Sequence, residues 1–126
     1  MNVVDSSGWL EYFADGSNAE FFAPAIEATD ELVVPVISIY EVFRRIVTQR
    51  GENQGLQAVA AMLRGSVADL DVQLALAAAK LAQEHRLPMA DSIILATARD
   101  HEAILWTEDE HFAGLSGVRY VSKQRS

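Results

Sequence analysis

Residues 87–112 read LPMADSIILATARDHEAILWTEDEHF, a pattern that indicates a helix followed directly by a strand. Its first part, ADSIILATARDH at residues 90–101, has the apolar spacing of an amphipathic helix, and AILWT at 103–107 is a short apolar run that favours a buried strand. Asp91 then lies in the first turn of the helix, and Asp109 follows the strand with one residue between them. A helix that leads directly into a buried strand is typical of a parallel sheet whose strands are connected through helices.

The rest of the chain shows the same alternation of short apolar runs and amphipathic segments. We expect strands at residues 2–5, 31–36, 67–70, 104–107 and 118–121. We expect helices around Trp9 and Phe13 and at about residues 17–28, 38–50, 52–65, 71–86 and 90–101. Ser6 and Ser7 can cap the first of these helices. The order predicts a three-layer α/β/α sandwich, in which helices cover both faces of a central, mostly parallel sheet of four to five strands.

The composition is that of a single domain. A chain of 126 residues, 50% of them hydrophobic, is long enough for one sizeable core. We therefore expect one domain over residues 1–126, with a frayed tail at about 122–126. No apolar run approaches the roughly 18 residues that a membrane span needs, and no basic segment precedes the apolar residues of the N-terminus, so we expect a cytoplasmic protein with no membrane partner.

The charge and the absence of cysteine limit the chemistry. Without cysteine, any metal must be bound by oxygen or imidazole ligands. The formal net charge of −8 argues against nucleic-acid binding, because phosphate contacts normally need a basic surface. The same charge would suit an acidic pocket that is neutralised by cations, or a protein that binds a basic partner.

Four carboxylates fall where the carboxyl ends of the predicted strands would meet. Asp5 closes the first strand, and Glu41 lies in the first turn of the helix after LVVPV. Asp91 and Asp109 lie before and after the strand at 104–107. In open parallel sheets, ligands bind beyond the carboxyl ends of the strands, where the strand order reverses. The four acids are therefore candidates for one site.

Each of these acids also has an ordinary structural interpretation. Asp5 could cap its helix, Asp91 could be favoured by the helix dipole, and Asp109 could be a turn former. Glu41 could pair with Arg44 or Arg45. A convergent quartet, however, requires a cation, because two bare carboxylates about 4 Å apart repel by on the order of 4 kcal/mol at an effective dielectric constant near 20. Carboxylates and water are the ligands that Mg²⁺ and Mn²⁺ prefer.

Three segments carry a resemblance to a known family. VVDSSGWLEYF at residues 3–13, VPVISIYEVFRR at 34–45 and the stretch at 87–112 together resemble the PIN-domain family, and within it the VapC-type toxins of toxin-antitoxin pairs. The resemblance covers almost the whole chain. Its most specific part is 87–112, where an alanine-aspartate pair, an apolar helix, an apolar strand and a threonine-x-aspartate motif follow at the family's spacing.

The resemblance implies a site and an activity. The acidic quartet of the family falls on the four acids chosen above, and Ser7 and Thr107 match hydroxyl positions that border the site. The implied protein is a Mg²⁺- or Mn²⁺-dependent endoribonuclease that hydrolyses RNA with a metal-activated water and leaves a 5′-phosphate and a 3′-hydroxyl. Asp5, Asp91 and Asp109 would bind the metal, and Glu41 would either bind it, directly or through water, or orient the attacking water.

The resemblance also implies partners. A cognate antitoxin would lie over the first two helices, whose aromatic residues otherwise belong to the core, and homodimers are usual in the family. Four arginines are candidates for phosphate contact or are simply solvated helix side chains: Arg44, Arg45, Arg50 and Arg64. We interpret Glu108, Glu110 and His111 as flanking surface residues.

The main alternative from another functional class is a receiver domain of a signalling system. In that interpretation Asp71 would be phosphorylated, Thr107 would be the switch hydroxyl and Lys123 the terminal lysine. Two features argue against it. A receiver needs a pair of acids at the end of the first strand, whereas Asp5 is followed by Ser6, and two predicted helices instead of one separate the second and third strands.

Overall fold

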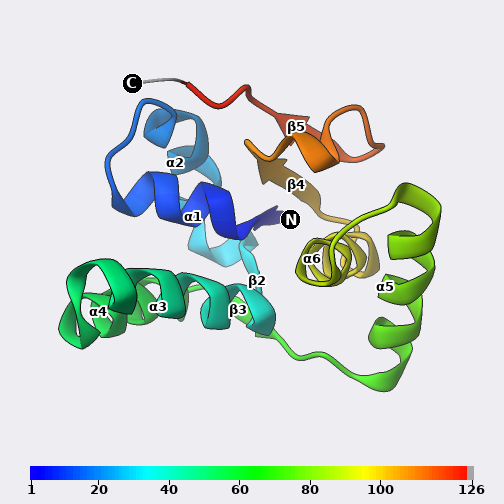
Figure 1. The fold of residues 1–126 in the computed structure, drawn as a ribbon, viewed down its shortest axis with the longest axis horizontal. Coiled ribbons are helices and arrows are strands. Elements are labelled where there is room, and N and C mark those ends of the chain that lie inside the picture. The colour runs from blue at the N-terminus through cyan, green and yellow to red at the C-terminus, as the bar shows by residue number, and fades with distance from the viewer. Residues whose placement is uncertain (125–126) are drawn as a thin grey trace.

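The computed structural model describes residues 1–124 (Figure 1). Its strands are β1 (Asn2–Val4), β2 (Val33–Pro35), β3 (Ser66–Ala68), β4 (Ile104–Thr107) and β5 (Val118–Tyr120). Its α-helices are α1 (Ser6–Phe13), α2 (Ala19–Glu27), α3 (Val36–Arg50), α4 (Glu52–Met62), α5 (Val72–His85) and α6 (Met89–Asp100), and two 3-10 helices are η1 (Thr29–Glu31) and η2 (Glu110–Phe112). The predicted order of strands and helices is confirmed.

All of the strand pairs in the described chain are parallel, and they form two groups. One sheet has the order β1-β4-β5 and the other pairs β2 with β3. A single parallel bridge between Asn2 and Leu32 links them, so that the strands follow one another as β3-β2-β1-β4-β5. The predicted central sheet is thus divided into three and two strands. The strand order reverses between β1 and β4, which is where open parallel sheets bind ligands.

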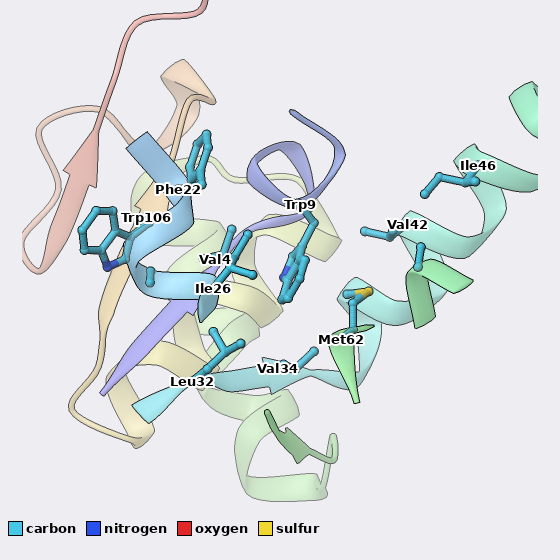
Figure 2. Close-up of a cluster of buried hydrophobic side chains, with 12 residues drawn as sticks. Val4, Trp9, Phe22, Ile26, Leu32, Val34, Val42, Ile46, Met62 and Trp106 are labelled. Carbon is cyan, nitrogen blue, oxygen red and sulfur yellow. The ribbon is translucent and has the colours of Figure 1, made fainter. Parts of the chain in front are cut away.

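Side chains on each strand alternate between two faces, as the pleat of a strand requires. Val4 of β1 and Trp106 of β4 pack into a core with Trp9 and the other apolar residues of α1 to α4 (Figure 2). Their neighbours Val3 and Leu105 pack into a second core with α6. Helices therefore cover both faces of the sheet, as the predicted three-layer sandwich requires. In Figure 1 the α3–α4 pair and the α5–α6 pair lie at opposite ends of the molecule.

The start of α1 differs from the prediction. Asp5, and neither serine, is the N-cap: its backbone is extended, and its side chain accepts a hydrogen bond of 2.9 Å from the amide of Gly8. An acid directly after a strand already has the extended backbone that an N-cap needs. Ser6 and Ser7 consequently occupy the first helical turn, and their hydroxyl groups are free to contact other side chains.

A close approach fixes the position of α1 on the sheet. A Cβ atom at Gly8 would lie 2.6 Å from side-chain atoms of both Val4 and Phe22, so that only glycine fits here without displacing its neighbours. Gly8 itself is buried. The backbone of α1 therefore lies directly against β1 and α2, and this contact places the first helical turn beside the end of β1.

At the C-terminal end, the described part of the tail is tied to the domain at one point. The Ser122 carbonyl accepts a hydrogen bond of 3.1 Å from Asn18 Nδ2. Residues 125 and 126 of the predicted frayed tail lie outside the described residues. Within residues 1–124, none of the helices is both long and apolar enough to span a membrane.

Candidate active site

Two of the predicted acids meet because β1 and β4 are neighbours in the sheet. Asp5 follows β1, and its amide donates a hydrogen bond of 3.1 Å to the carbonyl of Trp106 in β4. Thr107, the last residue of β4, donates from Oγ1 to Asp5 Oδ2 at 2.6 Å and accepts from the amide of Asp109 at 2.8 Å. Ser7 Oγ also donates to Asp5 Oδ1 at 2.8 Å. One buried hydroxyl group thus joins two acids that have 103 residues between them in the sequence.

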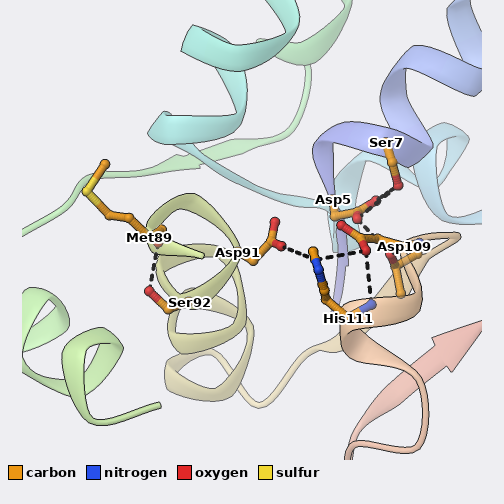
Figure 3. Close-up of polar contacts among 8 residues, drawn as sticks. Asp5, Ser7, Met89, Asp91, Ser92, Asp109 and His111 are labelled. Atoms are coloured by element: carbon orange, nitrogen blue, oxygen red, sulfur yellow. Dashed lines mark hydrogen bonds and ion pairs between the residues drawn. The ribbon is translucent and has the colours of Figure 1, made fainter. Parts of the chain in front are cut away.

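The third acid reaches the same place from the start of α6. His111 Nδ1 lies 3.2 Å from Asp91 Oδ2 and 3.2 Å from Asp109 Oδ1. Figure 3 shows the imidazole between these two carboxylates, with Asp5 and Ser7 on the far side of Asp109. Ligand atoms of Asp91, Asp109 and His111 all lie within 4.8 Å of one another. Carboxyl groups from α6 and from the loop after β4 therefore converge on one point.

Glu41 enters from α3. Its Oε1 atom accepts a hydrogen bond of 2.6 Å from Ser6 Oγ in the first turn of α1. The alternative pairing of Glu41 with Arg44 or Arg45 is absent, because no ion pair within residues 1–124 involves either arginine. The contact with Ser6 directs the Glu41 carboxylate towards the sheet edge and away from the exposed side of its own helix.

All four acids line a single cleft of about 710 Å³. Asp5, Asp91 and Asp109 lie at one end, where α6 and the carboxyl ends of β1 and β4 meet. From there the cleft continues between α1 on one side and the α3–α4 pair on the other. The site therefore lies at the point of strand reversal, as the strand-end argument predicts.

The surroundings favour the neutral forms of two of these acids. Burial is the main cause that raises the pKa of Asp5 from 3.8 to about 7, although hydrogen bonds from Thr107, Gly8 and Ser7 act in the opposite direction. Burial also raises the pKa of Asp91 to about 6, and the neighbouring charges of Asp109 and Glu41 add to the effect. The pKa of His111 is raised, first by the charge of Asp109 and then by its hydrogen bond to Asp91.

These residues fit a divalent cation of the hard, oxygen-binding type. Carboxylate oxygens are the preferred ligands of Mg²⁺ and Mn²⁺, and acids that raise one another's pKa gain most from a cation placed between them. Hydrogen bonds from Thr107 and Ser7 hold Asp5, and one from Ser6 holds Glu41. Such supporting contacts orient metal-binding side chains.

The ordinary interpretations of the acids hold alongside this convergence. Asp5 caps α1, Asp91 lies in the first turn of α6, and Asp109 caps η2 by accepting a hydrogen bond of 3.0 Å from the amide of His111. A capping carboxylate uses one oxygen for the backbone. The second oxygen can make other contacts, as Asp5 Oδ2 does with Thr107 and Ser7, and each carboxylate oxygen can make more than one contact, so that capping and metal binding are compatible.

Two residues that sequence reasoning assigned to the flanking surface belong elsewhere. His111 contacts both Asp91 and Asp109, because the tight turn of η2 returns the chain to the site two residues after Asp109. Glu108 is only 4% exposed, and its Oε1 atom accepts a hydrogen bond of 3.2 Å from Asn18 Nδ2. The position of His111 two residues after Asp109 was the one sequence signal that could have placed the histidine at the site. Nothing in the sequence indicated the contact of Glu108 with Asn18.

The residue central to the receiver interpretation has a structural role. Asp71 is exposed, caps α5 by accepting a hydrogen bond of 2.8 Å from the amide of Leu74, and does not line the cleft. Two helices, α3 and α4, separate β2 from β3, which a receiver domain does not have. The receiver alternative is not favoured.

Comparison with known proteins gives a match to a family model and to solved structures. The family model of the PIN domain matches residues 3–118. A toxin-antitoxin complex from Klebsiella pneumoniae contains a chain that is 26% identical, with a TM-score of 0.79 over 94% of this chain and 96% of that one. None of the curated proteins matches.

Two more distant structures share the fold. Mycobacterium tuberculosis VapC20, described as a sarcin-ricin loop cleaving toxin, is 19% identical, with a TM-score of 0.75 over 94% of this chain and 99% of that one. A DNA-bound VapBC structure from Salmonella typhimurium is 17% identical, with a TM-score of 0.71 over 97% and 98% of the two chains.

Proposed function

Because the chain belongs to the PIN domain family, we propose that it is a metal-dependent endoribonuclease and the toxin of a toxin-antitoxin pair. The observation that carries the proposal is the convergence of Asp5, Glu41, Asp91 and Asp109 in one cleft at the carboxyl ends of β1 and β4. The structural similarity to a chain of a toxin-antitoxin complex and to a toxin described as cleaving the sarcin-ricin loop supports both parts of the proposal.

The four acids would bind the cation or position the attacking water in the proposed reaction. Asp5, Asp91 and Asp109 would hold Mg²⁺, or Mn²⁺ in its place. When bound, the cation would lower the pKa of a coordinated water and neutralise charge on the phosphoryl oxygens. Glu41 would either bind the cation or orient the attacking water, and its hydrogen bond from Ser6 limits its freedom to turn away. Hydrolysis would leave a 5′-phosphate and a 3′-hydroxyl.

The hydroxyl groups near the acids support the proposed ligands. Thr107 holds Asp5 Oδ2 and the backbone amide of Asp109 at the same time, so that it keeps the separation of the two acids constant. Ser7 donates to the same carboxylate of Asp5. A ligand pair that is positioned before the metal binds loses less conformational entropy on binding.

We also propose an antitoxin partner, a homodimer and a cytoplasmic location. An acidic cleft favours a partner that inserts a basic side chain.

For the homodimer, the supporting observation is an exposed apolar face on α5, where Val72 is 76% and Leu76 is 62% exposed one helical turn apart. Apolar side chains grouped in this way commonly mark interaction sites. RNA as the substrate is consistent with the cytoplasm.

The experiment that tests the metal site is thermal unfolding of chelator-treated protein with and without Mn²⁺. A cation at 100 times its dissociation constant stabilises the folded state by about 2.7 kcal/mol. Wild type and Asp71→Asn should both gain stability, whereas Asp91→Asn should not. A Mn²⁺-induced gain in stability that persists in Asp91→Asn, or that disappears in Asp71→Asn, would contradict the proposed metal site.

Cleavage of RNA tests the activity itself. Wild type with Mn²⁺ should cut a mixture of cellular RNAs and leave 5′-phosphate ends, which a 5′-phosphate-dependent exonuclease then degrades. Asp91→Asn should leave the same RNA intact while it keeps the far-ultraviolet circular dichroism of the wild type. Cleavage by folded Asp91→Asn would contradict the assigned role of this residue.

A further inference from the structure

Basic residues of this acidic protein gather along the cleft. Four of its ten lysine and arginine residues line the cleft, namely Arg44, Arg45, Arg50 and Lys123. The three arginines lie on α3, and all are exposed. Within residues 1–124 none of them forms an ion pair with a carboxylate. Their charges are therefore available to a ligand in the cleft.

The arginines form a row that begins beside the acids. Arg44 and Arg45 follow Glu41 by three and four residues, which is about one helical turn, and Arg50 lies roughly 13 Å farther along the axis than Glu41 at 1.5 Å per residue. Three glutamines line the same side of the cleft, Gln49 on α3 and Gln54 and Gln57 on α4. The wall formed by α3 and α4 thus offers both cations and hydrogen-bonding amides.

The opposite wall of the cleft, formed by α1, has a different character. It presents the partly buried side chains of Leu10 and Phe13 together with the carboxylate of Glu11, and its residues Ser6–Phe13 include no basic residue. An anion in the cleft is therefore drawn to the α3 side, while the flat apolar part of a ligand is better accommodated at the α1 side. The cationic α3 wall suits the phosphate backbone of a nucleic acid, and the partly apolar α1 wall suits its bases.

We propose that Arg44, Arg45 and Arg50 bind the phosphates next to the scissile one in single-stranded RNA, with the bases facing Leu10 and Phe13. This inference rests on the proposed function, because it places the RNA relative to the acidic quartet. Phosphates that approach four carboxylates are repelled, and adjacent cations offset the repulsion. Paired bases cannot face an apolar wall, so the cleft selects unpaired RNA.

Salt dependence of RNA binding tests the arginine row directly. The probe is a fluorescein-labelled 12-nucleotide oligouridylate, titrated with full-length protein in chelator between 50 and 200 mM NaCl. Every protein carries Asp91→Asn, which prevents cleavage. Each phosphate contact with single-stranded RNA contributes about 0.7 to the slope of log K against log salt. Arg44→Gln/Arg45→Gln should therefore lower the slope by about 1.4 and weaken binding by about tenfold or more at the lowest salt.

The matched control is Lys80→Gln/Arg99→Gln, which removes the same charge from exposed positions outside the cleft. It should leave the slope unchanged. A 12-base-pair RNA duplex should compete at least about tenfold less well than the single strand. Equal slopes in the two double variants, equal competition by the duplex, or no binding of oligouridylate would each overturn the proposal.

Three further outcomes distinguish the RNA assignment from an acidic protein ligand, and its failure from the failure of the proposed nuclease function. If 12-residue polyglutamate displaces oligouridylate more effectively than unlabelled oligouridylate does, the arginine row is a site for an acidic protein segment and the RNA assignment is wrong. If RNA binding depends on the arginines but wild type with Mn²⁺ never cleaves RNA, the proposed nuclease function is wrong and phosphate binding by the arginine row is supported. If Mn²⁺-dependent cleavage is present and insensitive to Arg44→Gln/Arg45→Gln, only the proposal of phosphate binding by the arginine row is wrong.

Discussion

Replacement of Asp5 by asparagine should change how the stability of the metal-free protein depends on pH. Asp5 is 2% exposed, and burial raises its pKa from 3.8 to about 7. Between these values the folded protein holds a proton that the unfolded chain has released, so the free energy of unfolding falls as pH rises through this window. At 1.36 kcal/mol for each pKa unit, the whole window corresponds to roughly 4 kcal/mol.

The measurable part of this window lies above the isoelectric point of about 4.7. Between pH 5.5 and pH 8, the Asp5 carboxyl group should lower the free energy of unfolding of the wild type by roughly 2 kcal/mol. Asparagine has no charge to bury but disturbs the hydrogen bond from Thr107, at a cost of about 1 to 2 kcal/mol that is independent of pH. The difference in stability between Asp5→Asn and wild type should therefore shift by roughly 2 kcal/mol in favour of the variant from pH 5.5 to pH 8.

Urea denaturation followed by circular dichroism, in chelator and at several pH values, measures this difference. The other titrating groups near the site, Asp91 and His111, are present in both proteins and cancel in the comparison. Asp71→Asn removes an exposed acid outside the cleft and serves as the control, which should follow the wild type. Mn²⁺ should reduce the loss of stability at pH 8 in wild type only, since a cation favours the charged carboxylate. A difference between Asp5→Asn and wild type that stays constant over pH would refute the reasoning.

Three other substitutions test separate parts of the structure. Thr107→Val removes the closer of the two donors to Asp5 Oδ2, the other being Ser7 Oγ, and should lower stability by about 1 to 3 kcal/mol and weaken Mn²⁺ binding by about 10- to 100-fold in calorimetric titration. Unchanged Mn²⁺ affinity would contradict the role of the Thr107 hydroxyl group. Gly8→Ala brings a Cβ atom to 2.6 Å from Phe22 and should cost about 1 to 3 kcal/mol in urea denaturation, so equal stability would contradict the close packing of α1. Leu76→Lys should convert a dimer into a monomer in light scattering, and a monomeric wild type would argue against the proposed homodimer.

Much of the site's location could be predicted from local patterns. The apolar runs at Val3 and Val4 and at residues 104–107 are short and buried, and in a parallel sheet their carboxyl ends must share one edge. This rule is sufficient to bring Asp5 and Asp109 together although 103 residues separate their positions in the chain. Asp91 follows because it lies in the first turn of α6. Glu41 is predicted in the first turn of its helix, but α3 begins two residues earlier than predicted, at Val36, so that Glu41 lies in the second turn after the end of β2.

The contacts that hold these acids could not be predicted in the same way. The hydrogen bond of Ser6 to Glu41 depends on how α1 crosses α3, and the placement of His111 depends on the turn of η2. Burial of Glu108 beside Asn18 depends on where the chain passes after α1. Periodicity reports which face of an element is apolar, but it contains no information about the angle between two elements.

Hydrophobic period and chain connectivity, which can be read from the sequence, therefore set the order of strands and helices, the parallel sheet and the edge at which the acids gather. Three features depend instead on the packing of the folded chain: the donor that each carboxylate meets, the depth at which each acid is buried, and the wall of the cleft that carries the arginines. Contacts such as the 2.6 Å hydrogen bond between Thr107 and Asp5 are sensitive to shifts of a fraction of an ångström, and such shifts are set by the packing of side chains in three dimensions.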